Sequence, residues 1–393
     1  MPLDVSAVQT ALRAAGLDGW LLYDFHGSNP VARRLTGLAT GGHMTTRRWF
    51  YLIPAQGSPR GLVHKIERTT LAHLPGGSAE YAGRLELEAG LKTLLAGLRT
   101  IAMEYSPRGA IPYVSRVDAG TIELVRDQGV HVVSSGDLIQ QFEAVWSAAA
   151  FASHRAAAER LYRIKDRAFA TITARLRDGV PTSEFDIQTA MMEWFGEEGL
   201  ITDHPPIVAT ESNAGNPHYQ PSAIGSRAIG PSQVVLLDLW GKLPTPGAVY
   251  ADISWMGFTG TTPPAPLIAA FTAVRDARDA AVTLVQTAAA AGRDVRGWEA
   301  DAAARAVLFA AGFGSAILHR TGHSLGEEVH GNGAHLDDYE TRDERRLLPG
   351  TGFTIEPGLY FDTFGVRTEI NIAWGPDGPE VTGPRQMAVV PVV

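Results

Sequence analysis

The sequence contains no cysteine in its 393 residues. That absence excludes disulfide bonds, thiolate zinc sites and cysteine nucleophiles, so any bound metal ion must be held by oxygen and imidazole ligands. Basic residues are also in deficit: 34 Lys and Arg stand against 42 Asp and Glu, which gives a formal net charge of −8. This balance argues against a broad nucleic-acid-binding surface, because such surfaces concentrate Lys and Arg on one face.

Long hydrophobic runs are missing as well. No apolar run approaches the roughly 18 residues of a membrane span. Residues 1–5 lack the basic segment and the apolar stretch with which a signal peptide begins. We therefore expect a soluble, cytoplasmic protein that has neither membrane nor nucleic-acid partners.

The first 145 residues predict a small α/β domain. Short apolar runs rich in branched and aromatic residues alternate there with helical stretches, which is the pattern of a mixed α/β fold. The runs cover residues 20–23, 49–53, 61–64, 101–105 and 131–133. No segment of this region clusters several metal ligands or pairs a nucleophile with a base, so we expect it to have a structural or substrate-shaping role.

Residues 146–393 predict a second domain with an internal duplication. Apolar residues at spacings of three and four mark one face of a long helix, and a shorter helix follows it. The same order returns about 110 residues later. The four expected helices cover residues 161–176, 185–195, 267–291 and 298–311. Each helix pair precedes a strand-rich stretch, residues 207–258 and 319–374, which indicates a repeated helix–helix–sheet unit.

Two aspartates lie inside apolar runs. Asp238 interrupts the run of residues 234–240, and Asp252 stands in a similar run 14 residues later. A buried carboxylate is costly unless it is paired or bound to a metal ion. Gly241 and the Pro-rich residues 244–247 predict a turn between the runs, so a hairpin could aim both carboxylates at one point. For either aspartate alone, a salt bridge or a turn-capping role is the alternative.

Three further segments carry candidate ligands. His323 lies in a Gly-rich segment, where the backbone can approach closely and the imidazole is free to bind a metal ion. Glu356 ends an apolar strand that a Pro-Gly pair stops. Glu369 is expected on a strand over residues 366–372, on the same face as Arg367.

Together these segments supply four carboxylates and one imidazole. Four carboxylates would neutralise two divalent cations, and oxygen-rich ligation with one nitrogen suits manganese, cobalt, iron or zinc. Paired metal ions about 3.5 to 4 Å apart activate a shared water and stabilise the oxyanion that forms after its attack. The composition of the cluster therefore indicates hydrolysis. Its candidate ligands are Asp238, Asp252, His323, Glu356 and Glu369.

The order of these segments resembles that of the pita-bread metallopeptidases, in the branch that contains prolidase (Xaa-Pro dipeptidase), aminopeptidase P and creatinase. The resemblance extends over nearly the whole chain, because residues 19–22 and 35–37 match the creatinase-type amino-terminal domain in the expected order. It implies an α+β protein with a small α/β creatinase-type domain over residues 1–145. A pita-bread catalytic domain would then cover residues 146–393.

The resemblance also implies a role for each ligand. Asp238 would be the terminal ligand of one metal ion, and His323 and Glu356 would be terminal ligands of the other. Asp252 and Glu369 would bridge the two ions. Glu356 is also the family-like candidate to take a proton from the bridging water.

Three more residues match family positions. His218 and His330 resemble the two substrate-side histidines, and Arg367 resembles the arginine beside the last bridging ligand. Taken alone, His218 would more often be a surface residue, and Arg367 could pair with Glu369 or another acid. A structural or solvent-facing role is the simpler interpretation for three nearby histidines, namely His204, His319 and His335.

The implied activity is hydrolysis of Xaa-Pro bonds in proline-containing peptides by a homodimer with two divalent metal ions. Mn²⁺ is the first candidate, followed by Co²⁺, Zn²⁺ and Fe²⁺. A prolidase-like dipeptidase ranks first and an aminopeptidase P that acts on longer peptides ranks second. The long spacing from Asp238 to Asp252 and the Gly- and Asp-rich segment after His330 depart from the family pattern and could reshape the pocket. A metal-free creatinase-like hydrolase and a non-catalytic binding protein are further alternatives, but both should have lost metal ligands.

Overall fold

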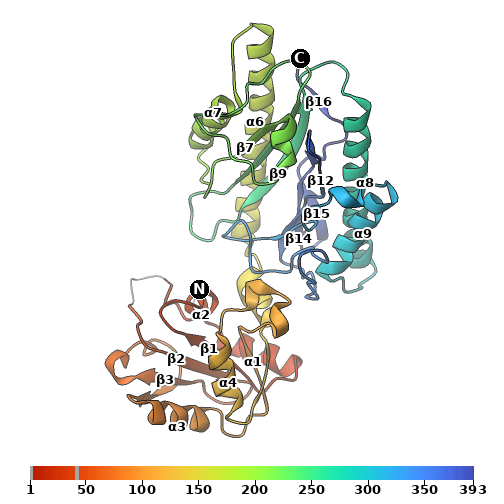
Figure 1. The fold of residues 1–393 in the computed structure, drawn as a ribbon. Helices are drawn as coiled ribbons and strands as arrows, with labels where there is room; N and C mark the ends of the chain where they lie inside the picture. The colour runs from red at the N-terminus through yellow and green to blue at the C-terminus, as the bar shows by residue number, and fades with distance from the viewer. Residues whose placement is uncertain (1–2, 40–43) are drawn as a thin grey trace. The chain divides into compact units, whose positions relative to one another are not determined.

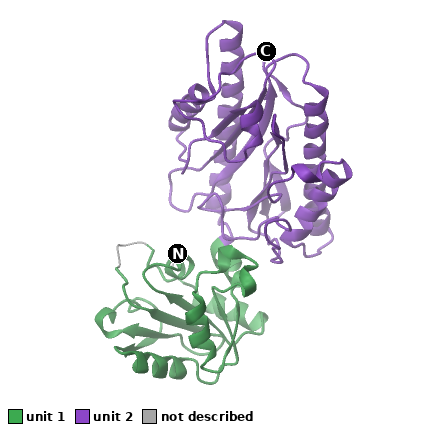
Figure 2. Ribbon diagram, viewed as in Figure 1, with its two compact units in different colours: residues 1–143 green, residues 144–393 purple. Residues whose placement is uncertain are grey.

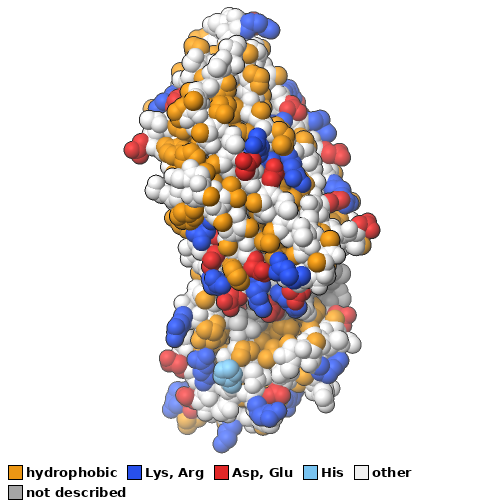
Figure 3. Space-filling view, turned by 90° about the vertical axis from the view of Figure 1, so that its right-hand side faces the viewer, with side chains coloured by type: hydrophobic (Ala, Val, Ile, Leu, Met, Phe, Trp, Pro, Cys, Tyr) orange, Lys and Arg blue, Asp and Glu red, His pale blue; other side chains and the backbone are white. Residues whose placement is uncertain are grey.

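The computed structural model describes residues 3–39 and 44–393. The chain forms two compact units, unit 1 (Met1–Glu143) and unit 2 (Ala144–Val393), which Figure 2 colours separately. Among the helices of the described ranges, none combines the length and the hydropathy that crossing a bilayer requires. On the face drawn in Figure 3, basic and acidic side chains are interspersed among hydrophobic ones.

Unit 1 is built on a six-stranded sheet in the order β4-β3-β2-β1-β5-β6 (Figure 1). The strands are β1 (Gly19–Asp24), β2 (Trp49–Pro54), β3 (Arg60–His64), β4 (Gly77–Tyr81), β5 (Thr100–Met103) and β6 (His131–Ser134). Five of the six are parallel to one another, and β2 is antiparallel to its neighbours β1 and β3. The five expected strands are present. The additional strand β4 begins at glycines that indicate a turn, and four of its five residues are exposed, so its sequence lacks the apolar pattern of a strand.

The helices of unit 1 cover both faces of this sheet. They are α1 (Val5–Ala14), α2 (Pro30–Leu35), α3 (Arg84–Leu94), α4 (Ala119–Arg126) and α5 (Gly136–Ile139). Alternate residues of β1 face opposite sides, as the two-residue period of a strand requires. Trp20 and Leu22 belong to the core that includes α1 and α2, whereas Leu21 and Tyr23 belong to the core that includes α3 and α4. Coverage of both faces explains why every residue of β1 is buried.

Unit 2 contains two helix pairs, and each pair is followed by strands. The first pair is α6 (Ala148–Arg177) and α7 (Glu184–Glu197), and the second is α8 (Ala265–Ala290) and α9 (Gly297–Ala310). Ser147 caps the amino end of α6, and Ser183 forms a capping box with Asp186 on α7. The four helices expected from the apolar spacing are therefore confirmed.

The sheets of unit 2 lie between these helix pairs (Figure 1). One has the strand order β16-β9-β8-β7, a second has the order β10-β11-β14-β15, and β12 pairs with β13. The strands are β7 (Ile207–Thr210), β8 (Val234–Gly241), β9 (Ala251–Phe258), β10 (Ser324–Leu325), β11 (Gly352–Ile355), β12 (Gly358–Tyr360), β13 (Gly365–Arg367), β14 (Ile370–Gly375), β15 (Gly378–Thr382) and β16 (Val390–Pro391). The repeated helix–helix–sheet order confirms the expected duplication.

The alternation along β8 directs its acidic residue inward. Val235, Leu237 and Leu239 pack with α6 and α7, whereas Leu236 belongs to the other core, which includes α8 and strands of the second sheet. Asp238 is two residues from Leu236 and therefore lies on the same side of β8. The carboxylate consequently faces the interior between the two sheets.

Residues 366–372 do not form one strand, contrary to the expectation. β13 ends at Arg367 and pairs with β12, whereas β14 starts at Ile370 and pairs with β11. Between them, the backbone N–H of Glu369 donates to the carbonyl oxygen of Ser254 in β9 at 3.1 Å. The chain thus changes its partner strands at Glu369. An alternating sequence pattern cannot show such a change, and Arg367 and Glu369 do not share one strand face.

Candidate metal centre and active site

The β8–β9 hairpin brings two of the candidate ligands onto one face. In its register Asp238 lies opposite Ser254, and Asp252 lies opposite Trp240. Direct partners in an antiparallel pair share a face, and so do residues two apart on one strand. Asp238, Asp252 and Ser254 therefore point to the same side of the sheet, as the predicted hairpin requires.

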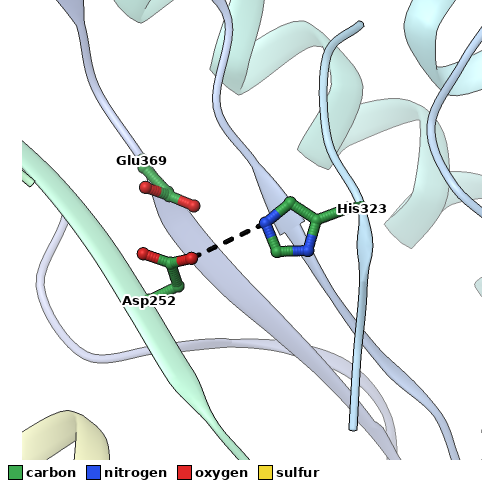
Figure 4. Close-up of side chains that lie close together, drawn as sticks. All are labelled: Asp252, His323 and Glu369. Atoms are coloured by element: carbon green, nitrogen blue, oxygen red, sulfur yellow. Dashed lines mark ion pairs between the residues drawn. The ribbon is translucent and has the colours of Figure 1, made fainter. Parts of the chain in front are cut away.

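Three candidate ligands meet at the centre of the site (Figure 4). One ligand atom from each of Asp252, His323 and Glu369 lies within 4.8 Å of the others, and all three residues are buried. Nε2 of His323 is 3.6 Å from Oδ2 of Asp252 and 3.4 Å from Oε1 of Glu356. Asp238 borders this group without belonging to it. The five residues come from strands β8 and β9 of one sheet and from segments next to β10, β11 and β14 of the other.

The backbone around His323 fixes the tautomer of its ring. Nδ1 lies 3.1 Å from the carbonyl oxygen of Ser324, an acceptor, so Nδ1 carries the proton and the lone pair of Nε2 faces the carboxylates. The preceding Gly322 is required for close packing, because a Cβ at that position would lie 2.2 Å from the carbonyl oxygen of Thr354. His323 is thereby held in the form that binds a metal ion.

The buried carboxylates of Asp252 and Glu369 lie close to other carboxylates, and this proximity disfavours their ionised forms. Burial, followed by the nearby Asp238 and Glu356, raises the pKa of Asp252 well above its usual value. Burial, followed by Asp252 and Glu356, does the same to the pKa of Glu369. Oδ1 of Asp252 and Oε1 of Glu369 are buried and have no hydrogen-bond partner within the described residues. Buried carboxylates that lie beside an imidazole nitrogen and keep an unpartnered oxygen fit a site for divalent cations.

Ser254 links Asp238 to this cluster. Its Oγ lies 2.7 Å from Oδ1 of Asp238 and 2.9 Å from Oε2 of Glu369, and it accepts a hydrogen bond from Nε of Arg367 at 2.9 Å. A hydroxyl group has one proton and can donate it to only one of the two carboxylates at a time. Sequence analysis missed Ser254, although its position two residues after Asp252 places it on the same strand face.

Arg367 pairs with Asp238 rather than with Glu369. Its Nη2 donates to Oδ2 of Asp238, and its Nη1 donates to the hydroxyl oxygen of Tyr360 at 3.0 Å. Burial alone would lower the pKa of Arg367, but Asp238 raises it well above its usual value, so the guanidinium stays charged. The sequence left open whether Arg367 pairs with Glu369 or with another acid, and the structure shows that its partner is Asp238.

Tyr360 extends these contacts to His319. Its hydroxyl lies 2.6 Å from Nε2 of His319, whose Nδ1 lies 2.6 Å from the carbonyl oxygen of Arg320. Nδ1 therefore carries the proton, and Nε2 accepts from the Tyr360 hydroxyl. Burial lowers the pKa of His319 to about 4 and raises that of Tyr360 to about 12, so both groups are neutral at pH 7. His319 supports the site through Tyr360 and Arg367.

The two substrate-side histidines of the family pattern are exposed. The ring of His330 lies 4.3 Å from that of His323, measured between centroids, and its side chain reaches solvent. His218 follows the short helix η5 (Glu211–Gly215) and is also exposed. His323 first, and then burial, Arg320 and His218, lower the pKa of His330.

The other two histidines noted in the sequence, His335 and His204, are not among the candidate ligands. His335 is buried and accepts a hydrogen bond from the backbone N–H of Ser324, next to His323. His204 lies on the surface, 3.3 Å from a carboxylate oxygen of Asp203. Their structural and solvent-facing environments agree with the simpler interpretation.

Glu184 is a buried carboxylate that sequence analysis did not single out. It is the first residue of α7 and is fully buried. Its Oε1 accepts from the backbone N–H and the hydroxyl of Thr210, at 2.7 and 2.8 Å. Its Oε2 accepts from the hydroxyl of Tyr219 at 2.6 Å and from the backbone N–H of Arg227 at 2.9 Å. These partners lie on both sides of His218 in the chain, so Glu184 holds the segment that carries it. Acidic residues are common in the first turn of helices, so no sequence signal marks this one.

We expect Glu184→Gln to loosen that segment. The amide nitrogen of glutamine cannot accept the hydrogen bonds that a carboxylate oxygen accepts, and a buried unpaired donor costs roughly 1 to 3 kcal/mol. Hydrogen exchange should therefore accelerate in residues 210–227, and the free energy of unfolding should fall by that amount. Glu193→Gln, on the exposed face of α7, is the matched control. Equal exchange and equal stability in the two variants would contradict the role of Glu184.

Comparisons with known proteins agree with this geometry. A segment of 231 residues is 28% identical to a probable dipeptidase PepE of Mycobacterium tuberculosis and covers 58% of this chain and 56% of that protein. A segment of 235 residues is 29% identical to an Xaa-Pro dipeptidase of Lactobacillus delbrueckii subsp. lactis and covers 58% of each protein. The chain thus matches little more than half the length of these curated relatives.

The fold has solved counterparts. The crystal structure of dipeptidase PepE from Mycobacterium ulcerans superposes with a TM-score of 0.70 over 99% of this chain and 96% of that chain, at 24% sequence identity. The overall architecture is therefore that of a pita-bread protein with its amino-terminal domain. The pattern of metallopeptidase family M24 matches residues 156–374, a range that includes all five candidate ligands. Because this match spans more than half of the chain, the protein belongs to metallopeptidase family M24.

Proposed function

We propose that this protein is a metal-dependent peptidase that cleaves Xaa-Pro dipeptides. The observation that carries the proposal is the buried group of Asp252, His323 and Glu369, in which two carboxylate oxygens have no partner among the described residues. The M24 family match and the similarity to proteins named as dipeptidases support the same conclusion. A non-catalytic role would not require an acidic cluster of this kind.

We assign the metal ligands to both sheets of unit 2. Two divalent ions would be held by Asp238, Asp252, His323, Glu356 and Glu369. Mn²⁺ is the first candidate, because four carboxylates and one imidazole form an oxygen-rich set, with Co²⁺, Zn²⁺ and Fe²⁺ as alternatives. The chemistry that such ions supply when bound is activation of a water and polarisation of the scissile carbonyl.

Glu356 is the residue that we assign to proton transfer. It follows β11 directly and is only partly buried, unlike Asp252 and Glu369. The hydroxyl of Thr354 lies 3.2 Å from Oε1 of Glu356 and orients its carboxylate. A carboxylate at the solvent-facing edge of the cluster can accept a proton from the attacking water and return it to the leaving nitrogen.

The remaining site residues would act on the substrate or on the ligands. We propose that His218 and His330 contact the peptide, since both are exposed histidines and His330 stands beside His323. Arg367 would orient Asp238 through its ion pair. An Xaa-Pro bond has no N–H, so recognition must rely on its carbonyl oxygen and on the termini of the peptide.

We further propose a creatinase-type domain over residues 1–145 and a catalytic domain over residues 146–393. The family resemblance and the likeness of the full-length fold to the dipeptidase structure support this division. The same resemblance supports a homodimer located in the cytoplasm. Light scattering of the purified protein tests the dimer directly.

A peptide-length panel tests the proposed activity. We expect Xaa-Pro dipeptides to be hydrolysed in the presence of added Mn²⁺ or Co²⁺, and Xaa-Pro-Xaa tripeptides to be hydrolysed at least about tenfold more slowly, a difference of about 1.4 kcal/mol in transition-state stabilisation. Metal analysis of the same sample should find about two ions per chain. Xaa-Ala dipeptides are the matched control for proline specificity. Faster hydrolysis of the tripeptides would assign an aminopeptidase P activity, and no hydrolysis of any peptide would reject the proposal.

A further inference from the structure

Unit 1 contains a cavity of about 550 Å³ that no step of the proposed reaction uses. Tyr23, His64 and Tyr81 line it, and they lie at the carboxyl ends of β1, β3 and β4. These three strands are parallel, so their carboxyl ends meet at one edge of the sheet. Ligands of open α/β sheets commonly bind at that edge.

The wall of this cavity carries an excess of positive charge. Arg47, Arg48 and Arg84 line it, and Asp118 is the one carboxylate among the described lining residues. The oxygens of Asp118 are already engaged, because they accept hydrogen bonds from the backbone N–H and the hydroxyl of Thr121 and from the hydroxyl of Tyr23. Within the described residues no ion pair joins Asp118 to any of the three arginines, and its single negative charge leaves the arginines in excess.

Arg48 has no acidic partner within the described residues, although it is partly buried. It lines the cavity together with Tyr23 and Tyr81, and its carbonyl oxygen accepts a hydrogen bond from the hydroxyl of Tyr81 at 2.8 Å. Removing a guanidinium from water without a counter-charge is unfavourable. A bound anion would supply that charge.

The two other arginines are available to the same ligand. The ion pair of Arg84 with Glu88 is exposed, and such pairs contribute little, about 0 to 1 kcal/mol. Within the described residues the guanidinium of Arg47 donates to the carbonyl oxygen and the hydroxyl of Thr46, and the nearby carboxylate of Glu67 accepts from its backbone N–H at 3.1 Å. Neither arginine is held by a buried contact, so both can turn toward a ligand next to Arg48.

The neutral part of the wall is aromatic. His64 stacks edge-on against Tyr81, and both of its ring nitrogens are engaged, with the backbone N–H of Ile66 and the carbonyl oxygen of Ala82. Phe25 adds an exposed ring. A flat organic group would pack against these rings while its anionic group meets the arginines.

We propose that this cavity of unit 1 binds a small organic anion that carries a carboxylate or a phosphate on a flat ring. Arg48 is its main electrostatic contact, and Arg47 and Arg84 supply further positive charge beside the anionic group of the ligand. The cavity is lined by residues of unit 1 and the assigned metal ligands belong to unit 2, and the proposal does not depend on the proposed peptidase activity.

Titration calorimetry on the full-length, metal-loaded protein tests this site. The probes are phenyl phosphate, benzoate, inorganic phosphate and the uncharged phenol. We expect saturable binding of phenyl phosphate or benzoate, and the tighter of the two identifies the anionic group. Binding should weaken with added salt, because partly exposed charges are screened. Phenol that binds as tightly as its anionic analogues, or inorganic phosphate that binds as tightly as phenyl phosphate, would overturn the proposal.

Two variants separate this cavity from anion binding at the metal centre. Arg48→Gln should weaken the binding of the preferred probe at least about tenfold, because it removes a charge-assisted contact. Arg60→Gln removes the same charge from an exposed position of unit 1 outside the cavity and should leave the affinity unchanged. Circular dichroism of both variants verifies their folding. Probe binding that is equal in the two variants, or absent in the unmodified protein, would refute the site.

Discussion

Asp252→Asn is expected to reduce kcat/KM for an Xaa-Pro dipeptide by about 1000-fold. Loss of a group that only orients a metal ligand already costs about 10- to 100-fold in metal affinity or activity, and Asp252 stands in the ligand cluster itself. An amide is neutral and a poor metal ligand, so the variant should also bind fewer metal ions. Steady-state kinetics and metal analysis on the same preparation measure both effects.

Asp377→Asn provides the control for this change. Asp377 is exposed in the turn between β14 and β15, so the same substitution there leaves the cluster intact and should preserve activity. Full turnover and full metal content in Asp252→Asn would remove Asp252 from the ligand set. Lost metal together with retained turnover would reject metal-dependent catalysis.

The second large effect is expected in the stability of the metal-free protein. The folded-state pKa values of Asp252 and Glu369 are raised above the ordinary 3.8 and 4.5, so the folded protein binds protons that the unfolded chain has released. Stability from these groups is then greatest below about pH 4 and falls as the pH rises toward the raised values. The slope is about 1.4 kcal/mol per pH unit for each proton involved.

Chelator-treated protein should therefore lose stability between about pH 4 and neutral pH, and added Mn²⁺ should restore it there. Bound cations favour the ionised carboxylates, so they reverse the sign of the effect. At pH 7 the metal-free Asp252→Asn variant should be more stable than the metal-free unmodified protein, because one of the repelling carboxylates is gone. Thermal unfolding of both proteins with and without metal measures the difference. Equal stability of the two metal-free proteins would show that the cluster is not destabilised by its own charge.

The sequence was sufficient to predict the hairpin of Asp238 and Asp252. Two apolar runs of similar length, each with one acid and separated by a turn, specify both the strands and the pairing between them, because side chains alternate with a period of two. The helices of unit 2 were equally predictable, since the apolar spacing marks their buried faces. Local patterns of this kind depend only on neighbouring residues.

The contacts missed from the sequence are long-range. The change of partner strand at Glu369 depends on β9, which is more than 100 residues away in the chain. An alternating sequence pattern predicts a strand but does not identify the strand with which it pairs. Ser254 and Tyr360 are ordinary residue types whose importance comes from the groups that surround them. Glu184 resembles many acidic residues at the start of helices, and only its burial shows that it binds a distant loop.

The division of the ligands between two sheets has a consequence for how the metal centre responds to motion. Asp238 and Asp252 come from the first half of the duplication, and His323, Glu356 and Glu369 come from the second half. Neither half alone contains the complete set. A shift of one sheet against the other by a fraction of an ångström would change the coordination distances, whereas a motion that carries both sheets together would leave them unaltered. Metal affinity therefore depends on how the two halves are aligned. Substitutions at the contact surface between the halves should change the metal affinity even when they lie far from every ligand.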